Sequence, residues 1–330
     1  MTRTRARTST RLLLALSMVT LLSACAPSSY LIRKPAPSGI SGSAASTPQP
    51  ATLNLVDERK ETDRTFSSGL LPAALRTEAG PVEPAAFLAE HLQGELASRG
   101  IAVRVSQGQA GQPGVYLQTF KMVNHRVSGF SPFVTFTFLS ADVDTPAGRK
   151  RMSAFVKRGK VPVWSFDEVI EPTLSQPLGL AVKELASKIA GQVYGWRASD
   201  SQLATLLGRV DAGIKLEGDA YLNVYALGFS NHPGAQERLV QLTGHADEYV
   251  RLAAISSLGT LGSAEKFKLL KSLYENRDGL WQDRAMAIKS IGDLGTSEAR
   301  AYLAEELKRW EAKGADKEAA WTAQIIRLFI

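Results

Sequence analysis

The sequence predicts an α+β N-terminal domain, a mostly antiparallel sheet with helices on one face, followed by an all-α helical solenoid. Three observations in the 330 residues lead to this fold class. Residues 52–197 combine alternating apolar segments with helical spacing, and residues 251–303 hold an internal repeat. A leader precedes the single cysteine, Cys25, and indicates that the chain is exported.

The first 24 residues have the three parts of a secretory signal peptide. Four arginines come first, Leu12–Leu22 then run for eleven residues without a charge, and Ser23 and Ala24 precede Cys25. The apolar run is shorter than the roughly 20 residues that a membrane-spanning helix needs. We therefore interpret residues 1–24 as a signal peptide that is cleaved off.

The stretch Leu22-Ser23-Ala24-Cys25 resembles the lipobox of bacterial lipoproteins. The resemblance implies that the sulfur of Cys25 carries a diacylglyceryl group and that Cys25 begins the mature chain, anchored in membrane lipid by its acyl chains. Ala26 follows where an aspartate favours inner-membrane retention in enterobacterial lipoproteins, so the resemblance implies an outer-membrane protein that faces the periplasm. The alternative is an ordinary secretory peptide followed by a stray cysteine.

Composition and charge narrow the classes of partner. A chain with one cysteine forms no internal disulfide, so burial alone must hold the fold in an oxidising compartment. The formal net charge of +7 falls to +3 without the four arginines of the leader. This mild charge does not indicate a nucleic-acid partner.

Residues 25–51 are predicted to form the lipidated cysteine and a disordered linker. The segment is rich in Pro, Ser, Gly and Ala and has no apolar periodicity. About 25 flexible residues have an end-to-end distance of roughly 25–30 Å, which would hold the folded part clear of the membrane.

Residues 52–197 are predicted to form the α+β domain. In the helix expected over 84–99, Phe87, Leu88, Leu92 and Leu96 recur at helical spacing, and Gly100 is a candidate C-cap. A second amphipathic helix is expected over 178–193. The expected strands lie within 52–59, 101–105, 115–123, 133–143 and 151–158.

This order of elements, with "LNLVDER" first and "LAEHLQGELASRGIAV" next, resembles small proteobacterial lipoproteins of the YajG type. Asp57 and Arg59 match an Asp-x-Arg after that family's first strand. The resemblance covers roughly 140 residues and implies an envelope protein without known catalysis. The chain departs from the family by its long C-terminal extension.

The C-terminal region, residues 198–330, contains an internal repeat. Arg251–Leu270 and Arg284–Leu303 are 33 residues apart and agree at nine of twenty positions. Self-similarity at this period is typical of a helical solenoid. The segments "EYVRLAAISSLG" and "WQDRAMAIKSIG" resemble the core of short bacterial HEAT-like repeats, with atypical units on either side. The resemblance implies a protein-binding array.

No pattern indicates catalysis. The four histidines, His91, His125, His232 and His245, form neither an i, i+4 pair nor a Cys/His cluster, so we expect no metal site and no cofactor. No G-x-S-x-G or P-loop motif occurs. We expect a non-enzymatic protein.

The segment Gly148–Lys160 is one candidate binding surface. It could contact anionic lipid headgroups or cell-wall polymer, or it could be a solvated hairpin. Its basic residues are Arg149, Lys150, Arg151, Lys157, Arg158 and Lys160. Arg251 and Arg284 could also bind a ligand, but we favour structural pairs with nearby acids such as Asp247 and Asp283. Asp57 and Arg59 are interpreted in the same way, as a pair within their domain.

The second candidate surface is a row of lysines on the repeats: Lys268, Lys271 and Lys308. The second helix of each HEAT-like pair lines the concave side, and its apolar residues, Phe267, Leu270 and Tyr274, should point inward. The lysines would then recognise an acidic protein surface. The sequence thus predicts an envelope adaptor or scaffold. The alternative is an accessory factor that binds lipid, lipopolysaccharide or peptidoglycan through the basic hairpin.

Overall fold

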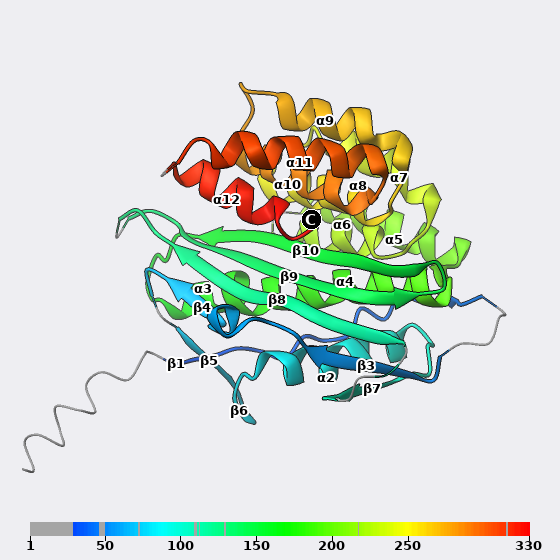
Figure 1. Cartoon of the computed structure of the whole chain (residues 1–330). Coiled ribbons are helices and arrows are strands. Elements are labelled where there is room, and N and C mark those ends of the chain that lie inside the picture. The colour runs from blue at the N-terminus through cyan, green and yellow to red at the C-terminus, as the bar shows by residue number, and fades with distance from the viewer. Residues whose placement is uncertain are drawn as a thin grey trace, which may run out of the picture.

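A computed structural model gives the fold of the chain (Figure 1). It describes residues 29–45, 50–71, 73–108, 111, 113–128, 130–216, 218–314 and 316–330. The predicted signal peptide and the predicted lipidation at Cys25 lie outside the described residues. Among the helices described, none is long and apolar enough to cross a membrane.

A six-stranded sheet forms the centre of the N-terminal region. Its strands follow the order β10-β9-β8-β3-β7, with β4 paired to β8 beside this path. The long strands β8, β9 and β10 are antiparallel as predicted, but β3 runs parallel to both β7 and β8. The sheet is therefore mixed, because a crossover that contains helix α2 joins β3 to β7. The strands are β3 (Thr52–Asp57), β4 (Ser67–Gly69), β7 (Arg104–Gln107), β8 (Gly114–His125), β9 (Phe133–Thr145) and β10 (Gly148–Lys160).

Helices α2 (Pro84–Ser98) and α4 (Gln176–Tyr194) cover one face of this sheet. Leu88, Leu92 and Leu96 of α2 are fully buried, as the helical spacing predicts. Short α3 (Asp167–Ile170) and a π-helical turn (Glu171–Ser175) lead into α4, and a short 3-10 turn (Glu61–Asp63) follows β3. Almost all of α4 is buried because it touches both the sheet and the C-terminal helices.

The segment before β3 corrects the prediction of a disordered linker over residues 25–51. In its described part, β1 (Ser29–Leu31) pairs with β5 (Ala74–Thr77), which pairs with β6 (Gly80–Pro81). Further along, β2 (Gly42–Ser43) pairs with β11 (Arg197–Ala198). Ile32 and Ile40 are buried between these points. An extended segment held by single apolar anchors has no periodicity, so its composition resembles that of a linker.

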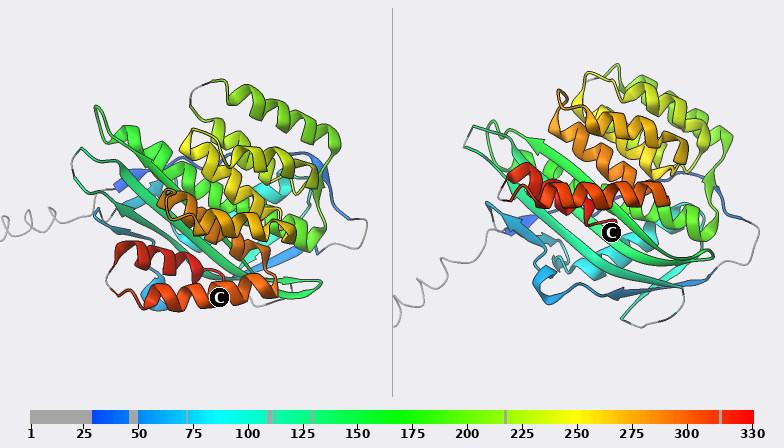
Figure 2. Two further views of the ribbon diagram at one scale, coloured as in Figure 1. Left: turned by 90° about the horizontal axis from the view of Figure 1, so that it is seen from above. Right: turned by 45° about the horizontal axis from the view of Figure 1, so that its top comes forward.

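The C-terminal region is helical. Helices α6, α8 and α10 pack side by side, and α7, α9 and α11 lie over them on the side away from the sheet (Figures 1 and 2). The helices are α5 (Asp200–Gly213), α6 (Ala220–Gly228), α7 (Gln236–Leu242), α8 (Glu248–Thr260), α9 (Phe267–Glu275), α10 (Trp281–Leu294), α11 (Ser297–Glu311) and α12 (Lys317–Ile326). Single 3-10 turns precede α7 (Pro233–Ala235) and α9 (Ala264–Lys266).

Close contacts between α6, α8 and α10 explain two positions that are identical in the two repeats: the serine at Ser257 and Ser290, and the glycine at Gly259 and Gly292. A Cβ atom at Gly259 would lie 2.6 Å from Cα of Ser290, and one at Gly228 would lie 2.2 Å from the Ser257 hydroxyl. The Ser290 hydroxyl donates to the Ile255 carbonyl at 2.8 Å. Glycine on one helix and serine on the next therefore let the backbones approach closely.

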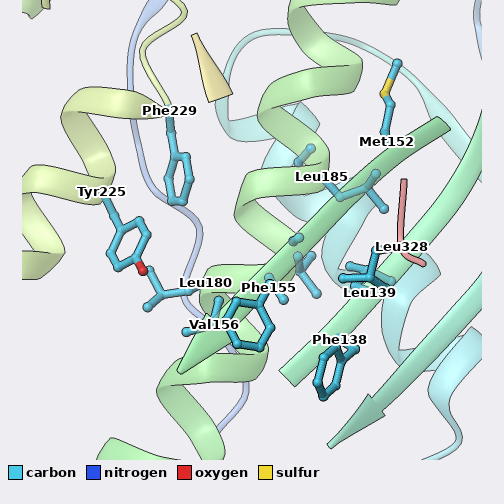
Figure 3. Close-up of a cluster of buried hydrophobic side chains, with 14 of the residues drawn as sticks. Phe138, Leu139, Met152, Phe155, Val156, Leu180, Leu185, Tyr225, Phe229 and Leu328 are labelled. Carbon is cyan, nitrogen blue, oxygen red and sulfur yellow. The ribbon is translucent and has the colours of Figure 1, made fainter. Parts of the chain in front are cut away.

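The second face of the sheet is covered by these repeats. Phe136 of β9 contacts Trp281 of α10 and Trp321 of α12, with ring centroids 5.7 and 4.9 Å apart. Ser153 of β10 donates to the carbonyl of Leu328 near the C-terminal end. Figure 3 shows side chains from β9, β10, α4 and α6 in one buried cluster. The two regions expected from the sequence therefore share a core.

Candidate functional site

The basic segment Gly148–Lys160 does not form one exposed patch. As β10 it extends along the whole sheet, and four of its six cations already have partners. Arg149 pairs with Asp144 at 2.9 Å and Arg151 with Asp142 at 2.5 Å, and Lys157 contacts Glu248 of α8. Arg158 is buried, with its guanidinium 3.8 Å from the ring centre of Tyr249 and 4.0 Å from that of Tyr221.

Lys150 and Lys160 are exposed and lie at opposite ends of β10. The six cations therefore do not gather on one exposed surface, because neighbours in a 13-residue strand are spread along its length and Lys157 and Arg158 are buried. Of the six cations of β10, only Lys150 and Lys160 have no partner among the described residues.

The other suspected ion pairs are structural. The Arg59 guanidinium donates two hydrogen bonds to the Asp57 carboxylate, at 2.8 and 2.9 Å. These hydrogen bonds keep the pKa of the Asp57 carboxyl below its usual value, although burial acts to raise it. Arg251 reaches Asp283 at 3.2 Å, and Arg284 reaches Glu318 at 2.7 Å. Each of these repeat arginines thus pairs with an acid about one repeat further along.

A buried cluster of four charges joins α4 to α10 at the edge of β10. The Lys188 ammonium lies 2.6 Å from Glu184 and 2.6 Å from Asp293, and Lys289 contacts the same two carboxylates. All four side chains are at most 5% exposed. Two cations and two anions balance within the cluster, which gives each buried charge a partner.

The electrostatics of this cluster follow from burial and from direct contact. Burial raises the pKa of Asp293, and the nearby Glu184 charge adds to the rise. Burial acts to raise the pKa of Glu184 as well, but Lys188 and Lys289 outweigh it and lower that pKa. Burial acts to lower the pKa of Lys289, while Asp293 and Glu184 raise it. The contacts therefore favour the charged forms of Glu184 and Lys289, whereas at Asp293 burial outweighs the two lysines.

A cavity of about 520 Å³ lies beside this cluster, between β10, α4 and the C-terminal ends of α8 and α10. Lys188 and Asp293 form part of its wall. Lys150, Arg197 and Arg300 also line it, and all three are exposed and make no ion pair with a described residue. We call this space the cationic cavity. Its unpaired cations suit an anionic ligand.

A second cavity, of about 420 Å³, lies between the sheet and helices α8, α10 and α12. Its lining includes Phe136, Tyr249, Trp281 and Trp321, so most of its surface is apolar. The indole nitrogen of Trp281 is buried and has no hydrogen-bond partner among the described residues.

The lysine row lies on the outer helices. Lys268 and Lys308 are exposed and Lys271 is half-buried; Lys271 is 3.9 Å from Glu275, and Lys308 is 2.9 Å from Glu305. The inward residues expected on α9 are buried: Phe267, Leu270 and Tyr274. α9 and α11 are adjacent, with the Phe267 and Tyr302 rings 5.8 Å apart.

Among the described residues, no three or more His, Cys, Asp and Glu side chains gather as metal ligands would. His91 packs on Phe87, with ring centres 4.3 Å apart, and His125 packs on Trp321 at 5.2 Å. His232 lies 2.8 Å from Asp200, and the His245 ring accepts from the Asp247 amide.

Sequence reasoning missed the groups that meet only in space. Glu184 and Lys188 were parts of an amphipathic helix, and their partners lie more than 100 residues away. Arg197 and Arg300 stood alone in the sequence. The sequence did hold a local signal for exposed apolar side chains. Large apolar residues stand beside turn-forming and polar residues in the segments "RVSGFSPF" and "VPVWSFDE".

Comparison with known families matches residues 221–283 to HEAT repeats. The match runs from α6 to the start of α10, so it includes one repeat recognised in the sequence and the unit before it. It supports HEAT-like repeats in the C-terminal region. A search of curated proteins gave no significant match.

Proposed function

We propose that the chain is a lipid-anchored envelope protein and a non-catalytic adaptor that binds another protein through its HEAT-like helices. In this proposal acylated Cys25 holds it in the outer membrane, facing the periplasm. The observation that carries the adaptor function is the HEAT repeat match at residues 221–283. HEAT-like arrays commonly serve as protein-binding scaffolds, although a fold alone does not determine a function.

The outer layer formed by α7, α9 and α11 is the binding surface in this proposal. The opposite side of the repeats packs against β10 and α4, so the outer layer is the broad helical face that remains available. On it Lys268 and Lys271 lie on α9 and Lys308 lies on the adjacent α11. A row of cations favours an acidic partner surface and speeds encounter.

The test is recovery of the partner after cross-linking in intact cells. We expect the triple change Lys268→Glu, Lys271→Glu and Lys308→Glu to reduce the recovered protein sharply. Thermal unfolding should change little, since Lys268 and Lys308 are exposed and Lys271 is only half-buried. Substitutions at such surface positions usually shift stability by less than about 0.5 kcal/mol each.

A matched control inverts three other lysines: Lys60→Glu, Lys215→Glu and Lys317→Glu. They are exposed, make no ion pair with described residues, and produce the same change in net charge. Equal loss of partner in both variants would mean that net charge, not the helical surface, controls binding. Normal binding by the first variant would exclude the lysine row.

The anchor is tested separately. Cys25→Ser should prevent acylation and leave an uncleaved precursor of higher mass. A variant that is processed normally and stays in the outer membrane would refute the lipid anchor.

The cationic cavity supports a second candidate function, the binding of an anionic envelope ligand. Lys150, Arg197 and Arg300 line the cavity and make no ion pair with a described residue, which suits a phosphate or carboxylate group. Arg197→Glu with Arg300→Glu should abolish salt-sensitive sedimentation with anionic vesicles or peptidoglycan. Unchanged sedimentation would exclude the cavity as the contact site.

A further inference from the structure

Four large apolar side chains are exposed at one end of the sheet. Val127 and Phe130 lie between β8 and β9 and are 82% and 96% exposed. Val163 and Trp164 lie between β10 and α3 and are 67% and 92% exposed. We call these four residues the apolar tip. Exposed apolar clusters of this kind mark sites of contact with proteins or membranes.

The two loops are neighbours. Phe133, at the start of β9, pairs in register with Lys160, at the end of β10. The Phe133 ring also lies 5.1 Å from Phe166, two residues after Trp164. Both loops therefore project from the same end of the sheet, on the left in Figure 1.

Hydrogen bonds give both loops a defined conformation. The Ser131 hydroxyl accepts from the amides of Val127 and Ser128 at 3.0 and 2.8 Å. The Glu168 carboxylate accepts from the amides of Val163, Trp164 and Ser165 at 2.9–3.3 Å. Because these hydrogen bonds hold the amides of Val127, Ser128 and residues 163–165, this part of the two loops loses less conformational entropy when it binds a surface.

The start of the described chain lies at this same end. The Tyr30 ring is 5.1 Å from Phe166, and β1 lies on the left in Figure 1. Ser29 is the fourth residue after Cys25, and four residues span at most about 14 Å. If Cys25 is acylated, as proposed above, the bilayer surface lies within that reach of β1.

We propose that the apolar tip is a membrane-contact surface that places Phe130 and Trp164 in the interfacial layer of the bilayer. Aromatic side chains favour this layer. Lys160 is exposed at the base of the tip, where an anionic headgroup would lie. Arg33, two residues after β1, has an 83% exposed side chain and lies 3.8 Å from Glu171. The proposal rests on the lipid anchor for its orientation, but the tip can be tested independently.

The experiment uses the full chain, purified and reconstituted in vesicles of phosphatidylethanolamine and phosphatidylglycerol. A photo-reactive benzoylphenylalanine replaces Phe130, Trp164 or, as the control, Ala147 in the turn at the opposite end of the β9–β10 hairpin. After irradiation, mass spectrometry identifies the cross-linked molecule, and the same samples report whether Cys25 is acylated. We expect several-fold more phospholipid cross-linked at positions 130 and 164 than at 147.

The outcomes separate the tip from the anchor. Lipid cross-linking at 130 and 164 no greater than at 147, with Cys25 acylated, would overturn the membrane contact and leave the anchor intact. Preferential cross-linking with Cys25 unacylated would support the contact and refute the anchor. The same positions in membranes from cells that express the protein provide a second measurement. Cross-linking there to protein in place of lipid would overturn the proposal.

Discussion

Lys289→Met should destabilise the whole chain, because Lys289 is fully buried where α10 meets α4. The substitution keeps the length of the side chain but removes one of two cations that face two buried carboxylates, Glu184 and Asp293. It also removes the hydrogen bond to the Ser256 hydroxyl. The remaining cation, Lys188, cannot compensate both carboxylates.

The expected loss follows from the cost of an uncompensated buried charge. Removing one partner of a buried pair costs about 3–5 kcal/mol. At about 2–3 °C per kcal/mol for a chain of this size, the melting temperature should fall by about 6–15 °C. Glu184→Gln combined with Lys289→Met leaves Lys188 and Asp293 as a balanced pair. The double variant should therefore lose less than the sum of the single losses, by about 1–3 kcal/mol.

The assay is calorimetric melting, with the exposed Lys317→Met as the control. One transition should move as a unit, because the cluster and the face of the sheet around Phe136 join the two regions. A shift for Lys289→Met as small as that for Lys317→Met would refute the buried cluster. A second transition that moves alone would show that the regions unfold separately.

Three more predictions concern the core and one histidine. Ile255→Ala should cost about 2–5 kcal/mol in denaturant unfolding, because Ile255 is fully buried in the repeats; a change below about 0.5 kcal/mol would place it on the surface. Gly259→Ala should destabilise because its Cβ meets Ser290, whereas Gly208→Ala, with open space around it, should stabilise by up to about 1 kcal/mol; the same sign for both would contradict the close helix contact. Burial lowers the pKa of His91 below its usual 6.5, so the unfolded chain takes up the proton first and stability should fall as pH drops from about 6.5 toward the lower folded-state value. His91→Leu should remove this component between pH 7.5 and 5 without losing a hydrogen bond of the Nε2 atom, which has no partner among described residues; an unchanged pH dependence would show that other groups cause it.

Much of the fold was predictable because it depends on local patterns. The alternation of side chains between two faces in residues 133–143 predicted β9, and the helical spacing of Leu88, Leu92 and Leu96 predicted α2. The 33-residue spacing in the C-terminal region located the repeat helices, since each helix buries the same positions against its neighbour. The candidate sites were less predictable. The basic segment was visible as composition, but its pairs with Asp142, Asp144 and Glu248 were not.

The segment of residues 29–45 shows why composition led to the wrong prediction of a disordered linker. Ile32 and Ile40 are two apolar residues among many small and polar ones, too few to form a pattern. Their burial depends on surfaces that form only when the sheet and α2 have assembled. The Ser38 amide, for example, donates to Glu95 of α2 at 2.8 Å.

Spacing along the sequence predicts the long helices, the long strands and the register of the repeats, because it decides which face of an element is apolar. Local spacing does not predict which elements meet. Glu184 lies beside Lys289, 105 positions away in the sequence, and the loops that carry Phe130 and Trp164 leave the same end of the sheet. Such meetings depend on how the repeats pack on the second face of the sheet, and packing is decided by the shape of the whole assembly rather than by any local pattern.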